Sequence, residues 1–325
     1  MKELISLVLI LGALSGILAF TLAIYLMPPT DDFHPENPYW NGMHKLTNLF
    51  QLKIVDNFTE LSEYKPRETA LLIIGPSKPF NSSEINYVNA FLSEGGLVLL
   101  VDDFGTGNDL LRGLNIPLRL NGHLLADSFQ GEKIGYMPRA KIYLKDLNEL
   151  ILNYATVIER SEKNTTNILL ISIAYSSPLS FLDLNLNKFR DENEPRGPFP
   201  VAILALYGNG SFILISDSSV LINAMIELGD NLKLLKTLIG DRLILLDTSH
   251  WVPNTLTIIK HRLSNMLSFL RLPEVKYLLL ISASILIFHF RKPLLKKDKN
   301  SIDEVLERHP TWDEKLLRRL QEDLS

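Results

Sequence analysis

Acidic and hydroxyl side chains follow three apolar segments of the chain, at the point where each segment ends. The segments are residues 97–101, 211–216 and 243–246, and each precedes an aspartate. The carboxyl ends of strands in an open α/β sheet form its ligand crevice, and carboxylates there could meet around one ligand or one hard cation. The candidate crevice residues are Asp102, Asp103, Asp217, Ser218, Asp247 and His250.

The same residue types also have a purely structural use. Asp, Ser and Asn are good N-caps where a strand leads into a helix, and a carboxylate there interacts favourably with the helix dipole. A functional crevice and simple capping are therefore both open interpretations of these residues.

Recognised catalytic motifs are missing from the sequence. The stretch 105–110, GTGNDL, begins like a dinucleotide-binding loop but has Leu110 in place of the third glycine. The chain has no phosphate-binding loop, no nucleophile elbow, no zinc-binding helix motif and no cysteine. Of its seven histidines, His250 is the only one at a predicted strand end. We therefore predict a non-catalytic protein with no cofactor and no metal.

The elements that would position the crevice follow a strand–helix rhythm. Residues 69–74 and 97–101 are continuously apolar, as in strands of a parallel sheet that is covered on both faces. Asn81 with Glu84 predicts a helix start between them. Gly208-Asn209-Gly210 predicts a hairpin that joins strands 200–207 and 211–216. The fold class is thus a three-layer α/β/α domain with a mainly parallel sheet.

Less regular segments complete this domain. We expect helices that begin at Asn108 and after Asp217, the latter running through Met225, and a further helix through 232–238. The middle segment, 121–200, is irregular apart from a strand at 168–174, and its last part, from residue 185, is expected to be an exposed loop. The lead-in at 28–46 contains Tyr39 and Trp40, whose burial should keep it ordered.

Two apolar runs predict membrane anchoring. Residues 4–27 are 24 residues without a charge, a helix of roughly 36 Å, longer than the apolar part of a signal peptide. Residues 277–290 are shorter, but a basic cluster follows them, which favours a second span over a helix packed on the domain. The cluster consists of Arg291, Lys292, Lys296, Lys297 and Lys299.

These runs predict a two-pass protein of the cell membrane with both termini cytoplasmic. The expected parts are an anchor (1–27), an extracytoplasmic α/β domain (28–272), a second span (273–292) and a cytoplasmic tail (293–325). Glycosylation sequons at Asn57, Asn81, Asn164 and Asn209 fit an exterior domain. The net charge of −4 argues against a nucleic-acid partner.

The tail contains two short amphipathic helices. Ser301 with Glu304 and Thr311 with Glu314 have the spacing of capping boxes. A segment of about thirty residues buries an apolar face poorly on itself, so we expect this face to dock on a partner rather than lie on the membrane or self-associate. The expected partner-binding residues are Trp312, Leu316, Leu317 and Leu320.

Several local motifs resemble a family of archaeal and bacterial membrane proteins, domain-of-unknown-function family 4350. They are HPENPYWNG, LLIIGP, FLSEGGLVLLVDDFG, SFILISDSSVLIN and ILLDTSH, and the likeness covers about residues 28–251. The resemblance implies a class I glutamine amidotransferase-like, flavodoxin-like fold. Active enzymes of that fold use a cysteine nucleophile, which this chain lacks. GldG-like relatives look like non-catalytic partners of membrane machines, and family 4350 is often found beside MoxR-type AAA ATPases.

Three functions are consistent with these features. We favour a non-catalytic, membrane-anchored binding or scaffold protein whose tail contacts a cytosolic AAA ATPase. An envelope hydrolase, or a domain that binds a ligand or metal at the acidic strand ends, is the second. An accessory subunit of an ABC-type exporter is the third, by analogy with GldG-like proteins alone.

Overall fold

The computed structural model describes residues 2–127, 135–161, 168–294 and 301–324. The sequon at Asn164 and the basic residues Lys296, Lys297 and Lys299 lie outside these ranges. The chain divides into two compact units, Met1–Lys260 and His261–Ser325, and each is described by itself.

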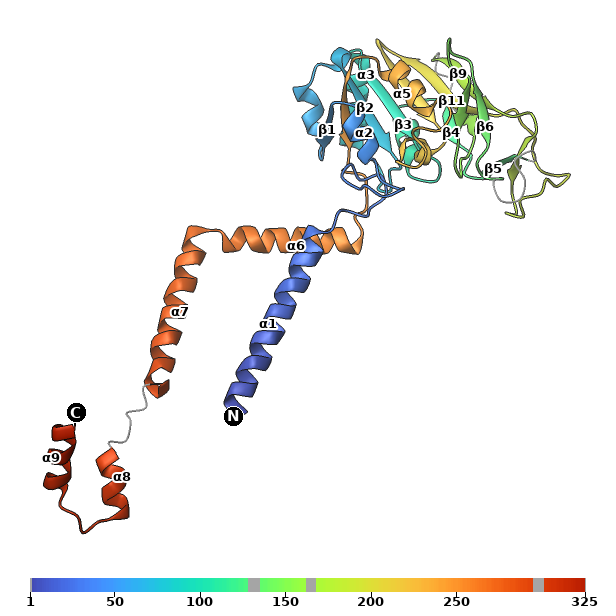
Figure 1. Cartoon of the computed structure of the whole chain (residues 1–325). Coiled ribbons are helices and arrows are strands. Elements are labelled where there is room, and N and C mark those ends of the chain that lie inside the picture. Colours follow the sequence, from blue (N-terminus) through green and yellow to red (C-terminus); the bar gives the residue numbers. More distant parts are fainter. Residues whose placement is uncertain (1, 128–134, 162–167, 295–300, 325) are drawn as a thin grey trace. The chain divides into compact units, whose positions relative to one another are not determined.

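The described part of the first unit contains a nine-stranded mixed sheet (Figure 1). Its spatial order is β1-β13-β2-β3-β12-β11-β9-β6-β7. The strands are β1 (Leu52–Val55), β2 (Thr69–Ile74), β3 (Leu97–Val101), β6 (Arg139–Ile142), β7 (Glu149–Ile151), β9 (Leu169–Ser176), β11 (Pro200–Tyr207), β12 (Gly210–Ile215) and β13 (Leu243–Asp247). Two small sheets pair β4 (Leu118–Leu120) with β8 (Ile158–Arg160) and β5 (Leu124–Asp127) with β10 (Ser180–Asp183).

Strand direction divides the large sheet into two halves. Strands β1, β13, β2, β3 and β12 are parallel, whereas β12, β11, β9, β6 and β7 pair antiparallel. The antiparallel half is larger than the single hairpin we expected. Its outer strands come from the middle segment, which looked irregular because β6 and β7 are only four and three residues long.

Helices cover both faces of the sheet, as the continuous apolar runs predict. Along β2, Leu72 and Ile74 face one core while Leu71 and Ile73 face the other. Helices α2 (His44–Leu49) and α5 (Asn231–Ile239) contribute to the first core. The second core receives α3 (Ser82–Ser93), α4 (Gly107–Gly113) and the 3₁₀ turn η1 (Phe58–Glu63). The domain is therefore a three-layer α/β/α structure, with a further 3₁₀ turn, η2 (Pro66–Glu68), before β2.

The start of α3 confirms the predicted capping box. The Asn81 side chain accepts from the backbone N–H groups of Ser83 and Glu84, and Glu84 accepts from the Asn81 N–H at 2.7 Å. Helix α4 begins at Gly107 instead, and the Asn108 side chain bonds the backbone of Leu120 in β4. The expected helix start at Asn108 is thus displaced by one residue.

We expect Asn81→Ala to lower the free energy of unfolding by about 1 kcal/mol, the usual cost of losing such a cap. Two backbone donors of α3 lose their acceptor in this variant. Urea denaturation of the full chain in detergent would measure the change. Ser82→Ala, one residue further on and exposed, is the control and should change stability by less than about 0.5 kcal/mol.

The prediction of a helix after Asp217 is wrong. Only a 3₁₀ turn, η3 (Ser218–Leu221), forms there, and turns follow it. Asn223 explains the difference, because its side chain is used to hold the lead-in rather than a helix. It donates to the carbonyls of Asn37 and Tyr39 and accepts from the Lys45 N–H.

The lead-in is ordered, but not by the burial of its aromatic residues. Tyr39 and Trp40 are 45% and 69% exposed. Asn37 is buried instead, and its side chain accepts from the Tyr39 N–H and donates to the Asp31 carbonyl. The lead-in is therefore ordered by hydrogen bonds of asparagine side chains and not, as we predicted, by burial of Tyr39 and Trp40.

The loop at 184–199 is exposed at its surface but is built on two buried carboxylates. Asp183 accepts from the backbone N–H groups of Asn187 and Lys188 and from the Tyr136 hydroxyl. Glu194 accepts from the Leu184 N–H at 2.8 Å. These contacts fix the loop against the end of β10, which the sequence pattern did not reveal.

Among the described residues, one helix is long and apolar enough to cross a membrane. It is α1 (Lys2–Leu26), whose window Val8–Leu26 has a mean hydropathy of 2.3. The second apolar run forms a helix, α7 (Pro273–Leu294), but does not meet that test. Between the sheet and α7 lies α6 (Thr255–Leu270), and the tail forms α8 (Ser301–Arg308) and α9 (Glu314–Leu324).

Candidate functional site

Asp102 occupies the glycine-containing loop that follows β3. One of its carboxylate oxygens accepts from the Gly105 N–H at 3.0 Å, and the other accepts from the Gly107 N–H at 2.8 Å. A Cβ at Gly107 would lie 2.5 Å from this carboxylate, so a side chain there would clash. The backbone donors that a phosphate-binding loop offers to its ligand are thus satisfied here by the protein's own aspartate.

Asp103 and Ser218 meet at the ends of the neighbouring strands β3 and β12, beside Asp217. Asp103 accepts from the Ser218 hydroxyl at 2.8 Å, so the predicted residues of these two strands do come together. Asp217 is fully buried and accepts from the Asn153 N–H at 2.6 Å and the Ser219 N–H at 2.7 Å. The bond from Asn153 therefore ties the end of β12 to the segment that follows β7, and the bond from Ser219 caps the turn after β12.

Burial raises the pKa values of all three aspartates. Removal from water is the largest cause for each, and it raises the pKa of Asp102 to about 6 and that of Asp217 to about 8. The pKa of Asp103 is raised as well, although the hydrogen bond from Ser218 opposes the shift. The nearby Asp103 charge contributes to the raised pKa values of both other aspartates.

These shifts predict that the domain loses stability as the pH rises from about 4 to about 8. The folded state holds the protons more tightly than the unfolded chain, whose aspartates titrate near pH 3.9. The stabilisation is therefore complete below about pH 4 and is lost as the pH passes the folded-state pKa values. We expect a loss on the order of a few kcal/mol, measured by urea denaturation across this range.

Asp217→Asn separates this effect from other titrations. The amide has the same shape and does not ionise, so the slope of stability against pH should become clearly shallower than in the wild type. Equal slopes in the two proteins would show that Asp217 does not ionise in this range.

His250 lies in a closed environment at the end of β13. Its Nδ1 is 2.7 Å from an Asp247 carboxylate oxygen, and its Nε2 is 3.5 Å from Glu84 at the start of α3. The ring stacks on Phe80 with 3.9 Å between centroids, and Phe58 lies 5.2 Å away. Only 2% of the histidine is exposed.

This arrangement differs from a serine–histidine–aspartate relay. In such a relay, the aspartate holds one ring nitrogen and the serine faces the other. Here the Ser249 hydroxyl lies 3.0 Å from Nδ1 and also donates to Asp247, so both partners are on the same side of the ring. Ser249 is thus not placed to transfer its proton to Nε2.

The six predicted residues form two separate groups at one edge of the sheet. Strand β2 lies between β13 and β3, so the pair Asp247–His250 is two strand spacings, roughly 10 Å, from Asp102. Within the described residues, no three His, Cys, Asp or Glu side chains are grouped so that they could hold a metal ion. Sequence reasoning missed Glu84 and Phe80 as partners of His250, because neither contact follows from spacing along the chain.

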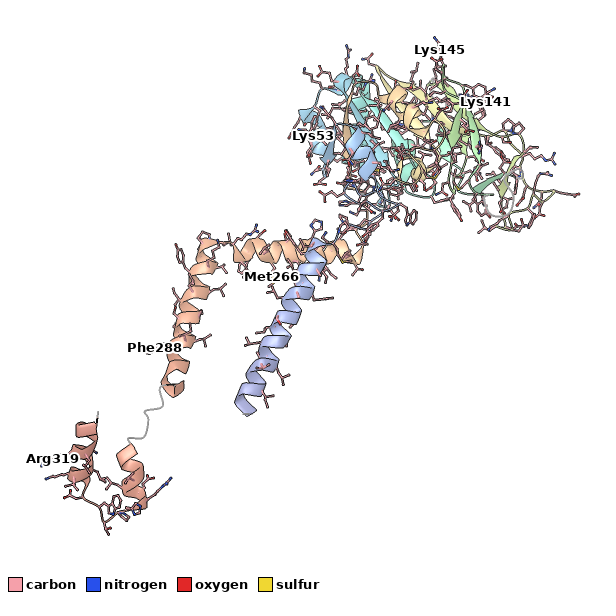
Figure 2. The ribbon with its side chains drawn as sticks, in the orientation of Figure 1. Lys53, Lys141, Lys145, Met266, Phe288 and Arg319 are labelled. Carbon is pink, nitrogen blue, oxygen red and sulfur yellow. The ribbon has the colours of Figure 1, made fainter. Side chains whose placement is uncertain are left out.

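A second feature is an open depression at the antiparallel end of the sheet. It has a volume of about 360 Å³ and is lined by polar, charged and aromatic side chains that include Arg139, Lys141, Tyr143, Asn148, Glu149 and Ser177. Lys141, labelled in Figure 2, lies 5.4 Å from the centre of the Tyr143 ring. Arg139 pairs with Glu149 at 3.1 Å. These groups suit a polar ligand or a protein surface more than a purely apolar one.

The predicted apolar residues of the tail are largely exposed, and Trp312 lies in the turn before α9 rather than in the helix itself. Trp312, Leu316 and Leu320 are each at least half exposed, and Leu317 is half-buried. The Trp312 ring stacks on His309 with 4.5 Å between centroids. The apolar side of α9 thus has no extensive cover within the described part of the second unit.

The chain shows distant likenesses to solved structures. The N-terminal domain of mmIFT52 is 13% identical, with a TM-score of 0.43 over 60% of this chain and 85% of that one. A ThuA-like protein from Bacteroides uniformis is 14% identical, with a TM-score of 0.34 over 59% and 78%. For a β-galactosidase from Bacillus circulans sp. alkalophilus, 13% identical, the TM-score is 0.30 and the shares are 51% and 26%.

TM-scores below 0.5 do not establish a shared fold, so these likenesses indicate neither the fold nor the function of this chain. No curated protein matches the chain. Residues 35–239, in contrast, match a protein family over more than half of the chain. The matched range begins in the lead-in and ends at the last residue of α5, so it includes the ends of β3 and β12. The chain therefore belongs to the family described as Domain of unknown function (DUF4350).

Proposed function

We propose that this protein is a non-catalytic binding or scaffold protein anchored in a membrane. The main support for the proposal is that the strand-end side chains are already bound by other groups of the protein. Asp102 and Asp217 each accept two hydrogen bonds from backbone N–H groups, and His250 is enclosed by Asp247, Glu84 and two phenylalanines. Side chains used in this way stabilise loops, which supports a binding role for this edge of the sheet.

Two membrane spans are part of the proposal. Helix α1 supplies the first. For the second, α7 has 22 residues, roughly 33 Å, and its charged residues lie near its ends. Its apolar side chains between Leu278 and Phe288 are largely exposed. Arg291 and Lys292 follow the apolar part, which supports a cytoplasmic tail and an extracytoplasmic α/β domain.

The tail is proposed to bind a cytosolic protein, and the α/β domain a partner outside the membrane. The exposed Trp312 is of the kind that anchors protein interfaces, and the exposed Leu316 of α9 adds apolar surface beside it. A MoxR-type AAA ATPase is our candidate, because the resemblance to family 4350 implies one. For the α/β domain, the depression around Arg139 and Tyr143 is the candidate contact site for a glycan or protein. The resemblance to family 4350 implies an amidotransferase-like fold, and a domain of that fold with no cysteine to act as nucleophile fits a binding role.

Crosslinking in native membranes tests the tail. We expect the full chain to capture a cytosolic ATPase, and Trp312→Ala with Leu316→Ala to reduce that capture at least tenfold, since anchor residues each contribute about 1–2 kcal/mol or more. Arg319→Ala, an exposed residue of α9, is the control. Equal capture by the double variant and the wild type would contradict the proposed role of these two residues.

A further inference from the structure

Helix α6, between the sheet and α7, has a continuous apolar stripe along one side. Five of its apolar residues recur at intervals of three and four, and Thr257, His261, Ser264 and Ser268 lie opposite them. Ile258, Leu267 and Phe269 are apolar residues outside this stripe. The stripe consists of Leu256, Ile259, Leu263, Met266 and Leu270. Met266, labelled in Figure 2, is 60% exposed. A stripe of this kind in an extended surface helix calls for an apolar surface to cover it.

All the charged residues of α6 and its flanks are positive. From residue 248 to residue 273 there is no aspartate or glutamate, whereas Lys260, Arg262 and Arg271 lie in this stretch, with His261 between the first two. The rest of the chain is acidic, since the net charge is −4 overall. The stretch is therefore complementary to a surface that carries negative charge.

The first turns of α6 are tied to the end of α1. The Lys260 ammonium donates to the backbone carbonyl of Met27, the residue directly after the apolar window Val8–Leu26. The Thr257 hydroxyl donates to Asp31, and the Asn254 N–H donates to the same carboxylate. If α1 spans a membrane, these bonds place the start of α6 at the height where α1 leaves the hydrocarbon.

The same bonds show which side of α6 faces the protein and which side is left to contact another surface. Thr257 belongs to its polar side and faces Asp31 of the lead-in. Lys260, in contrast, lies at the border of the stripe, next to Leu256 and Leu263. Most of the stripe lies on the side opposite Thr257. A helix of 16 residues, roughly 24 Å long, thus starts at the membrane boundary and leads into the apolar α7 two residues after it ends.

We propose that α6 lies along the membrane surface, with its apolar stripe in the acyl boundary and its cationic residues against anionic lipid headgroups. This inference rests on the proposed membrane anchoring and adds an in-plane helix to it. Amphipathic helices with Lys and Arg beside an apolar face bind such interfaces. The helix would hold the α/β domain close to the bilayer instead of leaving it on a free connection.

The chain contains no cysteine, so single labels test the inference directly. Met266→Cys reports the stripe, Ser264→Cys the polar side and Leu14→Cys the first span. Each full-length variant carries an environment-sensitive fluorophore and is reconstituted into phosphatidylcholine vesicles with or without phosphatidylglycerol. Nitroxide lipids quench labels in the acyl region, and iodide quenches labels in water.

We expect the Met266 label to be quenched by nitroxide lipids and protected from iodide, and the Ser264 label to behave in the opposite way. Phosphatidylglycerol should increase the protection at Met266. Arg262→Gln with Arg271→Gln should abolish that increase, whereas Lys53→Gln on β1 should leave it unchanged.

Three outcomes would overturn the inference. A Met266 label open to iodide would place the stripe in water, and a label shielded from both quenchers would show that protein covers it. If phosphatidylglycerol still increased the protection of the Met266 label in the Arg262→Gln, Arg271→Gln variant, the proposed contact of these residues with anionic lipid would be wrong. If the Leu14 label also fails to sense lipid, the proposed anchoring fails with it, whereas a lipid-quenched Leu14 confines the failure to α6.

Discussion

His250→Ala is expected to lower the free energy of unfolding by about 3 kcal/mol, a typical cost for emptying a closed core site. The ring fills the space beside Phe80 and Phe58, and its loss leaves a cavity between them. Asp247 also loses its 2.7 Å contact while remaining buried. Urea denaturation of the full chain in detergent, followed by tryptophan fluorescence, would report the change, because Trp251 is the adjacent residue.

His123→Ala is the matched control. That histidine is exposed, so its loss should change stability by less than about 0.5 kcal/mol. If His250→Ala left stability unchanged but abolished binding or an activity, the structural role would be wrong and the crevice interpretation would replace it.

Asp217→Ala is expected to destabilise the domain by about 3 kcal/mol or more. The substitution leaves the backbone N–H groups of Asn153 and Ser219 without their acceptor at a buried position, and each such group costs about 1–3 kcal/mol. The bond from Asn153 also joins the end of β12 to the segment after β7, which lies far away in the sequence. We therefore expect a lower denaturation midpoint and faster proteolysis within the antiparallel half of the sheet.

Asp109→Ala provides the comparison for Asp217→Ala. Asp109 forms a 3.2 Å pair with Arg112 near the surface of α4, and pairs of this kind contribute about 1 kcal/mol or less. A similar small effect for both variants would show that the buried contacts of Asp217 do not hold the two halves together.

The parallel half of the fold could be predicted because its signals are local. Strands β2 and β3 are unbroken apolar runs, and the Asn81 capping box lies within four residues. The segment after Asp217 could not be predicted, because Asn223 bonds residues almost two hundred positions earlier in the chain. Long-range side-chain contacts of this kind leave no periodic pattern in the sequence.

The candidate site shows the same division. Sequence pattern placed six polar residues at the strand ends, and the structure has all of them at that edge of the sheet. The strand order could not be read from the sequence, so it was not evident that β2 separates Asp247 from Asp102. Nor did the pattern reveal that the glycines after β3 accommodate the Asp102 carboxylate itself.

The proposed function requires a domain on one side of a membrane and a partner-binding tail on the other, so it depends on membrane topology. The most direct measurement is labelling of single cysteines with a membrane-impermeant maleimide in intact cells and permeabilised cells. Ser82→Cys on the α/β domain and Thr311→Cys in the tail are both exposed positions. We predict that Ser82→Cys is labelled in intact cells and Thr311→Cys only after permeabilisation. Labelling of both positions in intact cells, or of neither, would place domain and tail on the same side of the membrane and contradict the proposed topology.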